Sequence, residues 1–402
     1  MKNVVIAGAG QAAIWAIKTL RSEGYQGSIT VIGEESESFY ERPPLSKAML
    51  TQEPDYNSLK IFSDEAVDEL DITLIKPVRV EKIDRVNKKV ITNNNQEFPY
   101  DKLLIATGSK AKIPVSEWEN IPNVFSLRNI EDSKKIREKI ESAKNIAIIG
   151  GGWIGLEVAA SLKSLGLNVT LYELSNRLCS RSITNEVSDY LLNLHKQQGI
   201  TINLACGGIE IESDTHDQSV KIKTKESATR YEAVLLGTGA HINKEIAAES
   251  GIEVADAIVV DKYCQTSDPN IFAAGDVAIH PDLGFSIQSW ANAQNQGVIA
   301  AKSILSMNEA YEDTPWLWSD QYDKNIQILG SSLKIEECRL VIREEPNGSV
   351  CFFYLNSENK LQYVVAVNNN KAIKIAKRWM KSNLTLDPEL LQDPNVNILK
   401  IK

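Results

Sequence analysis

Short apolar runs and stretches with helical spacing alternate at the start of the chain. The run Val4–Ala7 is followed by Gly8-x-Gly10-x-x-Ala13, then by apolar residues that recur every three or four positions, and then by a second run, "SITVIGEE". This pattern predicts a strand, a tight turn, a helix and a second strand. The glycine spacing between strand and helix is typical of a dinucleotide-binding unit.

Each position of this glycine pattern has a physical role. Gly8 allows the tight turn, Gly10 lets backbone N–H groups approach a pyrophosphate, and Ala13 permits close packing of the helix on the strand. The N-terminus of the helix adds positive potential for the phosphates. Glu34 ends the second predicted strand, 21 residues after Ala13, where a carboxylate can accept hydrogen bonds from ribose hydroxyls.

The same arrangement occurs a second time. In "NIAIIGGGWIGLEVAASLKSLGLNVTLYE" a predicted strand precedes Gly150, Gly152 and Gly155, and Glu173 follows 18 residues after Gly155. One copy is compatible with glycines that serve packing alone, but two complete copies indicate two dinucleotide sites, for NADH and for FAD. Glu173 favours the free 2′-hydroxyl of NADH over the 2′-phosphate of NADPH, although Arg177 lies close enough in sequence to weaken that preference.

Two further apolar strands end at Thr-Gly, "YDKLLIATGSK" and "YEAVLLGTGAH", and they bracket the second glycine unit. We therefore expect an NADH-binding domain, residues 113–240, inserted into an FAD-binding domain made of residues 1–112 and 241–320. In "DPNIFAAGDVAIH" a predicted strand ends at Asp276, where sheets of this kind bind ligands. Successive short strand-like runs and one helix predict a mostly β C-terminal domain with its own core over residues 321–402.

Composition and charge narrow the classes of function. The 402 residues are 43% hydrophobic and 24% charged, as in ordinary soluble proteins, and no apolar run is long enough to cross a bilayer. The start, "MKNVVIAGAG", reads as a first strand and not as a signal peptide, so we expect a cytoplasmic protein. The net charge of −9 argues against nucleic acid as the main partner. The five cysteines form no C-x-x-C pair and the four histidines are far apart, so we expect no redox disulfide and no metal site.

The stretch "YERPPLSKAML" follows the first glycine unit. Residues that precede a proline avoid the helical region, and Pro44 suits the first position of a helix. We therefore expect an extended, stiff lead-in and then a short helix, an arrangement that would hold Lys47 in a fixed direction.

With these motifs the chain resembles the FAD-dependent, NADH-using ferredoxin reductases, the family of putidaredoxin reductase, rubredoxin reductase and the reductase components of Rieske dioxygenases. The resemblance covers essentially the whole chain and is carried by "ERPPLSK", "GGGWIGLE", "IFAAGD", "SWANAQNQGVIAA" and "PWLWSDQYD". It implies an α/β fold of the glutathione-reductase type, with two dinucleotide-binding domains and a mostly β C-terminal domain.

The resemblance also implies an activity. Electrons would pass from NADH through FAD, one at a time, to a small two-iron two-sulfur ferredoxin or rubredoxin that serves a cytochrome P450 or a Rieske-type oxygenase. The active disulfide of the wider superfamily is not expected here, because no cysteine precedes Cys179.

Individual residues take roles from the same resemblance. Lys47 would lie beside the flavin with Glu157 as its ion partner, and Arg42 would contact the FAD phosphates. Trp318 would shield the flavin edge, with Asp320 and Gln321 shaping a docking floor for the partner. The residues expected to line the FAD are Ala12, Glu34, Lys47, Val80, Arg128, Asp276 and Trp290.

The predicted C-terminal helix is basic on an otherwise acidic protein. Its cations are either a solvated helix face or a landing site for an acidic ferredoxin. They are Lys371, Lys374, Lys377, Arg378 and Lys381. Two alternatives to a ferredoxin reductase remain open: a reductase of a small acceptor on the same fold (monodehydroascorbate-type, or an NADH oxidase), and a non-catalytic NADH-sensing flavoprotein resembling apoptosis-inducing factor.

Overall fold

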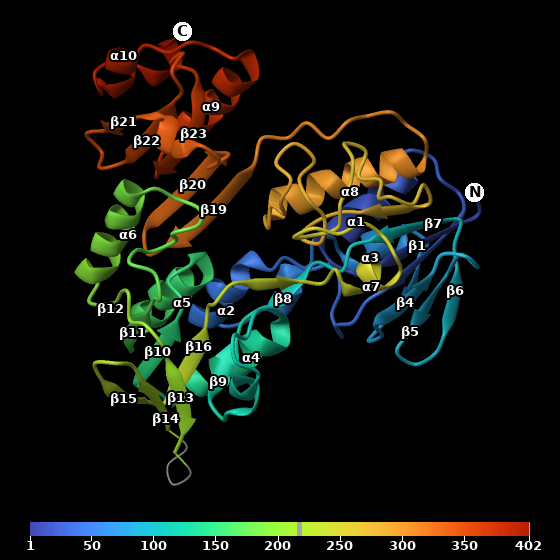
Figure 1. Cartoon of the computed structure of the whole chain (residues 1–402), viewed down its shortest axis with the longest axis horizontal. Coiled ribbons are helices and arrows are strands. Elements are labelled where there is room, and N and C mark those ends of the chain that lie inside the picture. The colour runs from blue at the N-terminus through green and yellow to red at the C-terminus, as the bar shows by residue number, and fades with distance from the viewer. Residues whose placement is uncertain (215–218, 402) are drawn as a thin grey trace. The chain divides into compact units, whose positions relative to one another are not determined.

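The computed structural model of the chain describes residues 1–214 and 219–401. Residues 215–218, inside the predicted NADH-binding domain, and residue 402, at the end of the predicted C-terminal domain, lie outside the described part. The chain forms two compact units, and Figure 1 labels their elements. The first unit comprises Met1–Arg42, Asp55–Lys110 and Ala240–Asp313, and the second comprises Pro43–Pro54, Ala111–Gly239 and Thr314–Lys402. The limits of the three predicted domains stay a prediction.

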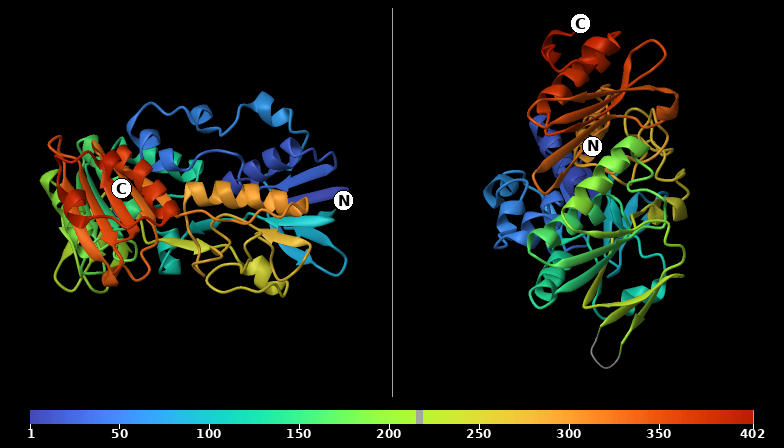
Figure 2. Two further views of the ribbon diagram at one scale, coloured as in Figure 1. Left: turned by 90° about the horizontal axis from the view of Figure 1, so that it is seen from above. Right: turned by 90° about the vertical axis from the view of Figure 1, so that its left-hand side faces the viewer.

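The first unit is built on a parallel sheet with the strand order β18-β7-β1-β2-β3. Helices α1 and α8 lie side by side against it (Figure 2), and their contact is close because a Cβ added at Gly297 would collide with the carbonyl oxygen of Ala12. The bounds are β1 Asn3–Ala7, α1 Gln11–Ser22, β2 Ser28–Ile32, β3 Thr73–Ile75, β7 Lys102–Ile105, β18 Ile271–Ala273 and α8 Trp290–Ile304. The strand–helix–strand unit predicted at the first glycine pattern is therefore present.

A small antiparallel sheet and short helices complete the first unit. Val80, Ile83 and Val90 of β4 and β5 are buried against one face of the parallel sheet, the face that carries Val5 of β1 and Leu103 of β7. These elements are α3 Asp64–Asp68, β4 Val80–Asp84, β5 Lys89–Thr92, β6 Glu97–Pro99 and α7 Glu245–Glu249. A separate two-stranded sheet is formed by β8 Ser109–Ala111 and β17 Ala240–Ile242.

The second unit contains the second predicted strand–helix–strand arrangement, in a parallel sheet with the order β12-β11-β10-β16-β9. Helix α5 is buried along most of its length, from Gly155 to Leu162, because it packs on β10 and β11 and also on the later strand β19. The bounds are β9 Val124–Ser126, α4 Ile130–Ile140, β10 Asn145–Ile149, α5 Trp153–Ser164, β11 Asn168–Tyr172, α6 Asn185–Gln197, β12 Thr201–Asn203, β13 Glu210–Ser213, β14 Val220–Lys223, β15 Ala228–Tyr231 and β16 Ala233–Leu236.

The C-terminal part of the second unit is an antiparallel sheet with the order β19-β20-β23-β22-β21. Its two faces belong to two different cores: Phe353 packs with α9, whereas Phe352 packs in the cluster that holds α5 and α6. The separate core predicted for the C-terminal domain therefore buries only one face of this sheet. The bounds are β19 Trp316–Gln321, β20 Lys324–Gly330, β21 Arg339–Glu344, β22 Val350–Leu355, β23 Leu361–Val367, α9 Asn370–Ser382 and α10 Pro388–Gln392.

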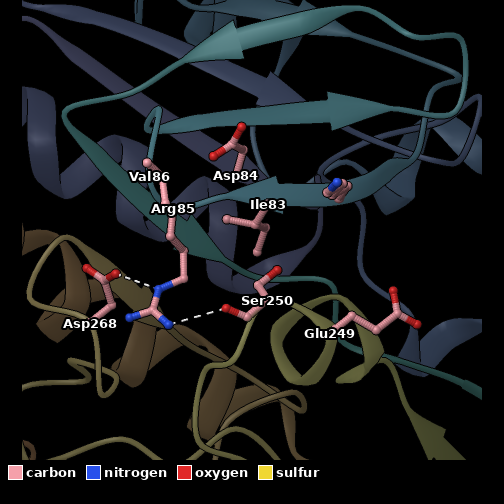
Figure 3. A pocket seen from close by; sticks show the side chains of 8 residues that line it. Ile83, Asp84, Arg85, Val86, Glu249, Ser250 and Asp268 are labelled. Carbon is pink, nitrogen blue, oxygen red and sulfur yellow. Dashed lines mark hydrogen bonds and ion pairs between the residues drawn. The ribbon is translucent and has the colours of Figure 1, made fainter.

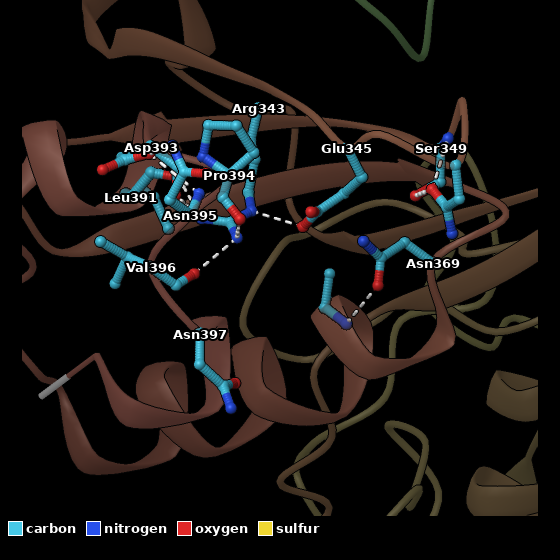
Figure 4. Close-up of polar contacts among 12 residues, drawn as sticks. Arg343, Glu345, Ser349, Asn369, Leu391, Asp393, Pro394, Asn395, Val396 and Asn397 are labelled. Atoms are coloured by element: carbon cyan, nitrogen blue, oxygen red, sulfur yellow. Dashed lines mark hydrogen bonds and ion pairs between the residues drawn. The ribbon is translucent and has the colours of Figure 1, made fainter.

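A buried arginine ties the end of the chain to this sheet (Figure 4). Arg343 on β21 is 2% exposed and its Nε pairs with Glu345 at 2.6 Å. Its Nη1 and Nη2 atoms donate to backbone carbonyl oxygens of the C-terminal segment: those of Leu391, Asp393, Pro394 and Val396. Over the described residues, no helix is both long and apolar enough to cross a membrane.

Candidate functional site

The first glycine loop leaves open space at the N-terminus of α1. Gly8 has a φ of +114°, and a Cβ there would collide with the carbonyl oxygen of Ala106 at the end of β7. The loop is therefore pressed against the neighbouring strand, which only glycine permits. A Cβ at Gly10, by contrast, would meet nothing within 4 Å. Gly10 thus borders free space beside the helix N-terminus, which fits a pyrophosphate.

The second loop repeats this geometry inside the second unit. Gly150 has a φ of +109° and lies against the carbonyl oxygen of Gly237, just past β16, while the nearest neighbour of a Cβ at Gly152 is 4.0 Å away. A Cβ at Gly155 would collide with the carbonyl oxygen of Gly150, so this helix needs glycine where the first loop accepts the fully buried Ala13. Both loops therefore have room for a dinucleotide phosphate, each within its own unit.

The two predicted ribose-binding carboxylates have different surroundings. Glu34 is 64% exposed and lies 3.7 Å from Arg79. Glu173 accepts hydrogen bonds from the backbone N–H of Gly151 at 2.6 Å and of Ser175 at 2.7 Å. A carboxylate oxygen has two lone pairs, so these bonds leave acceptor capacity for a ribose hydroxyl. The ribose contacts of both residues stay predictions.

Arg177 is held by its own loop. Its guanidinium donates to the carbonyl oxygens of Ile183 at 2.6 Å and Ser180 at 2.7 Å. Backbone carbonyls thus engage one N–H group on each terminal nitrogen and hold the side chain in its own loop. The preference for NADH over NADPH stays a prediction.

Arg42 lies in a cluster with two acceptors from the same segment. It pairs with Glu35 at 2.5 Å, donates to the Tyr40 hydroxyl at 2.9 Å, and its guanidinium lies 5.0 Å from the centre of the Tyr40 ring. Burial alone would lower the pKa of Arg42, but the charge of Tyr40 and the charge and hydrogen bond of Glu35 together raise it. Glu35, the neighbour of Glu34, is thus the carboxylate that pairs with Arg42. The predicted contact of Arg42 with FAD phosphates stays untested.

Lys47 and Glu157 come together as predicted, although they are 110 residues apart. The Lys47 Nζ atom lies 2.8 Å from Glu157 Oε2, and the carboxylate is 4% exposed while the lysine is 19% exposed. Ser46 donates to the same oxygen at 2.6 Å, and Ser319 on β19 donates to Oε1 at 2.6 Å. A buried carboxylate needs such partners, because an unpaired charge in an apolar interior is strongly unfavourable.

The two prolines explain how Lys47 is positioned. The expected extended lead-in is wrong at the prolines themselves, because Pro43–Ser46 forms a 3-10 turn; Lys47 then precedes the expected short helix, α2, Ala48–Thr51. The lysine ammonium also donates to the carbonyl oxygen of Pro43 at 3.1 Å. Among the described residues these contacts use two of its three N–H groups, so one is left for a ligand.

The tryptophans at the start of β19 form a stack with the basic helix. Trp316 and Trp318 have ring centres 5.2 Å apart at 25°, and the Lys377 ammonium of α9 lies 5.0 Å from the Trp316 ring. Each cation of α9 is exposed. The predicted docking residues Trp318 and Lys377 are thus joined through Trp316, which places the aromatic pair at the edge of the basic helix face.

The remaining predicted FAD residues are distributed over both units. Asp276 follows β18 and accepts from the Ser109 hydroxyl at 2.8 Å, and Val80 is buried at the start of β4. Trp290 begins α8 and Ala12 is buried in α1, where α8 packs on it. Arg128, in the second unit, donates its backbone N–H to Asp132 at 2.9 Å. Their contacts with FAD stay predictions.

The predicted position of Gln321 is wrong. It was expected on a docking floor, but it is 0% exposed and bonds to His195 at 2.8 Å and to Ser319 at 3.0 Å. The hydrogen-bond partners of Glu157 other than Lys47 were also missed. Ser46 could have been found, because it adjoins Lys47 in a segment predicted to be rigid. No sequence signal links Ser319 or His195 to this carboxylate.

A surface pocket of about 590 Å³ beside β4 carries no comparable chemistry (Figure 3). Arg85 is its central cation, but it pairs with Asp268 at 2.8 Å and donates to the carbonyl oxygens of Ser250 and Gly251. The guanidinium is thus engaged by the protein itself. Among the described residues there is also no cluster of His, Cys, Asp and Glu that could hold a metal ion.

Comparison with known proteins agrees with this geometry. A family model described as pyridine nucleotide-disulphide oxidoreductase matches residues 2–297, and a model described as reductase C-terminal matches residues 316–401. The ferredoxin–NAD(+) reductase component of the p-cumate 2,3-dioxygenase system of Pseudomonas putida is 35% identical over 401 residues, covering 98% of this chain and 97% of that protein.

Two further proteins are similar to this chain over nearly its whole length. Rhodocoxin reductase of Rhodococcus erythropolis is 31% identical over 400 residues, covering 98% of this chain and 93% of that protein. Among solved structures, the covalent putidaredoxin reductase–putidaredoxin complex matches with a TM-score of 0.91 and 31% identity over 99% of this chain and 97% of that chain. The predicted resemblance, fold class and oxidoreductase class are confirmed. The chain belongs to the pyridine nucleotide-disulphide oxidoreductase family, among the ferredoxin–NAD(+) reductases.

Proposed function

We propose that this chain is an FAD-dependent NADH:ferredoxin oxidoreductase that delivers single electrons to a small two-iron two-sulfur ferredoxin or to a rubredoxin. The observation that carries the proposal is the pair of open glycine loops, at Gly10 and Gly152, in a chain that aligns over 98% of its length with a ferredoxin–NAD(+) reductase component. When bound, FAD supplies the chemistry that accepts a hydride and releases single electrons. The residues of this chain bind and orient the two dinucleotides.

The loop around Gly10 would hold the FAD pyrophosphate, and the loop around Gly152 would hold that of NADH. The carboxylate of Glu173 supports NADH over NADPH, since a 2′-phosphate would meet its negative charge, and backbone carbonyls hold Arg177 in its own loop. Lys47 is proposed to present its remaining N–H group to the flavin, with Glu157 holding the ammonium in place.

The cysteines support an external electron acceptor. All five are free, and burial raises the pKa of the Cys179 and Cys264 thiols, so neither is a reactive thiolate at neutral pH. A flavoprotein of this family without a redox disulfide must pass its electrons to another molecule. Free cysteines also suit the reducing environment of the cytoplasm, where we place the activity.

The basic face of α9, with Trp316 and Trp318 at its edge, is the proposed landing site for the ferredoxin. Exposed cations attract an acidic partner over long distances and orient it on approach. Trp318 would then lie on the side from which electrons leave.

The proposal is tested with the purified protein reconstituted with FAD. We expect a yellow protein that reduces a two-iron two-sulfur ferredoxin with NADH, and that uses NADPH with a kcat/KM lower by at least about tenfold, the effect of about 1.4 kcal/mol. Absorbance of the ferredoxin and of NADH measures both rates. A protein that stays colourless after reconstitution, or that reduces oxygen or a small dye but neither ferredoxin nor rubredoxin, would contradict the proposal.

A further inference from the structure

A chain of hydrogen bonds runs through the interior of the second unit and ends at Glu157. The Tyr322 hydroxyl lies 3.0 Å from His195 Nδ1, and His195 Nε2 lies 2.8 Å from Gln321 Oε1. Gln321 Nε2 lies 3.0 Å from the Ser319 hydroxyl, which lies 2.6 Å from Glu157 Oε1. We call the residues Tyr322, His195, Gln321 and Ser319 the donor chain.

The carboxylate at the end sets the direction of every bond in the donor chain. An ionised carboxylate only accepts, so Ser319 must donate to Glu157, and its own oxygen then accepts from the Gln321 amide nitrogen. The Gln321 oxygen is left facing His195, so Nε2 must carry a proton and donate. The same ring then accepts at Nδ1 from the Tyr322 hydroxyl. Every dipole therefore points toward the carboxylate, an arrangement in which the bonds strengthen one another.

Burial makes these bonds matter. Ser319, Gln321 and His195 are each 0% exposed, so water is no substitute for a lost partner. Burial also lowers the pKa of His195, despite the opposing hydrogen bond to Gln321, and burial raises the pKa of Tyr322. The imidazole is therefore neutral and the phenol protonated at neutral pH, the two states that the direction of the chain requires.

We propose that His195 is a positioning residue that acts on the Lys47–Glu157 pair through the donor chain. Ser319 holds Oε1 of the carboxylate, so that Oε2 faces Lys47 and Ser46. When the hydrogen bond from His195 to Gln321 is lost, the donor chain no longer orients Ser319. The carboxylate then loses a donor, and the lysine ammonium loses its fixed direction. This inference rests on the proposed function only in that the direction of Lys47 matters for the reaction.

Two substitutions of His195 separate its hydrogen bond from its bulk. The amide nitrogen of His195→Gln reaches about as far as Nε2 and can still donate to Gln321, whereas the shorter amide of His195→Asn reaches only as far as Nδ1. Both variants place an uncharged amide in the same space. We expect His195→Asn to slow flavin reduction by NADH by about tenfold, because a Ser319 that is no longer oriented withdraws its hydrogen bond from the charged Glu157. His195→Gln should stay within about twofold of the parent.

Two readouts do not depend on turnover. Nitrogen-15 NMR of the holoprotein should show His195 protonated at Nε2 and not at Nδ1, with the signal assigned by its loss in His195→Gln. The midpoint potential of the bound flavin should shift in the same direction in His195→Asn and in Ser319→Ala, and should not shift in His195→Gln. Ser319→Ala is the smallest change in the chain, so it serves as the second variant should a His195 variant fail to fold.

The outcomes separate this inference from the proposed function. If Lys47→Met slows flavin reduction but His195→Asn and Ser319→Ala leave the rate and the potential as in the parent, the positioning role is overturned and the proposed function stands. A ring protonated at Nδ1 also overturns it. If Lys47→Met has no effect on flavin reduction, the role of Lys47 in the proposed function fails. The tautomer of His195 measured by NMR still shows whether the bonds of the donor chain run in the inferred direction.

Discussion

Gly152 and Gly155 lie three residues apart at the start of α5, yet they serve different purposes. A Cβ at Gly155 would collide with the carbonyl oxygen of Gly150, so that glycine is needed for the fold itself. Gly152 has a φ of −83°, which any residue can adopt, and the nearest atom to an added Cβ is 4.0 Å away. The protein therefore gains nothing structural from glycine at 152, and the open space there points to a ligand.

Gly152→Ala should leave stability unchanged and weaken NADH binding. The added methyl group would occupy the space that the pyrophosphate needs, so we expect the Kd for NADH to rise by at least about tenfold, or about 1.4 kcal/mol. Calorimetric titration of the FAD-loaded protein with NADH measures the Kd, and a thermal melt measures stability.

Gly155→Ala is the matched control, because it should lower the melting temperature through backbone collision. Gly10→Ala should instead reduce retention of FAD while the loop around Gly152 still binds NADH. Unaltered NADH affinity in Gly152→Ala would show that the nucleotide phosphate lies elsewhere.

At the scale of elements, β21 is held to the end of the chain by Arg343. Arg343→Met keeps much of the side-chain volume but leaves Glu345 and several carbonyl oxygens without their donor. Removing one partner of a buried ion pair costs about 3–5 kcal/mol, so we expect the free energy of unfolding to fall by about 3 kcal/mol. Urea unfolding, followed by far-ultraviolet circular dichroism, measures this loss.

Arg339→Met on the same strand is the control, because Arg339 is exposed. Its expected effect is within about 0.5 kcal/mol. Equal stability of the two variants would mean that the C-terminal segment is anchored by its apolar contacts alone.

The elements that local pattern encodes were predictable, and the contacts between distant segments were not. Both strand–helix–strand units were anticipated because glycine spacing and apolar periodicity act within about 30 residues. The pairing of Lys47 with Glu157 came only from resemblance. His195 and Gln321 meet across 126 residues of sequence, and nothing local distinguishes a buried glutamine in "SDQYD" from an exposed one. The same lack of local information placed Gln321 wrongly on a surface.

At the scale of the whole molecule, the distribution of charge decides the attraction of an acidic partner more than the net charge does. The chain carries a net charge of −9, so an acidic ferredoxin would on average be repelled. The exposed cations of α9 form a local exception, and Lys377 also touches Trp316. Lys374 and Lys381 are seven residues apart, on one face of the helix, and can be changed without removing the contact of Lys377.

Reversing the charge of both Lys374 and Lys381 to Glu should lower the kcat/KM for ferredoxin by about tenfold at low salt, because electrostatic steering raises association rates by that factor or more. The loss should shrink as salt increases, since the screening length falls from about 10 Å at 0.1 M to about 3 Å at 1 M. Reduction of the flavin by NADH, which involves no partner protein, should be unchanged. As a control for net charge, Lys135→Glu on α4 changes an exposed helical lysine by the same charge as Lys374→Glu alone, and it should have little effect. Equal losses in the α9 and α4 variants would trace the effect to net charge and remove α9 as the landing site.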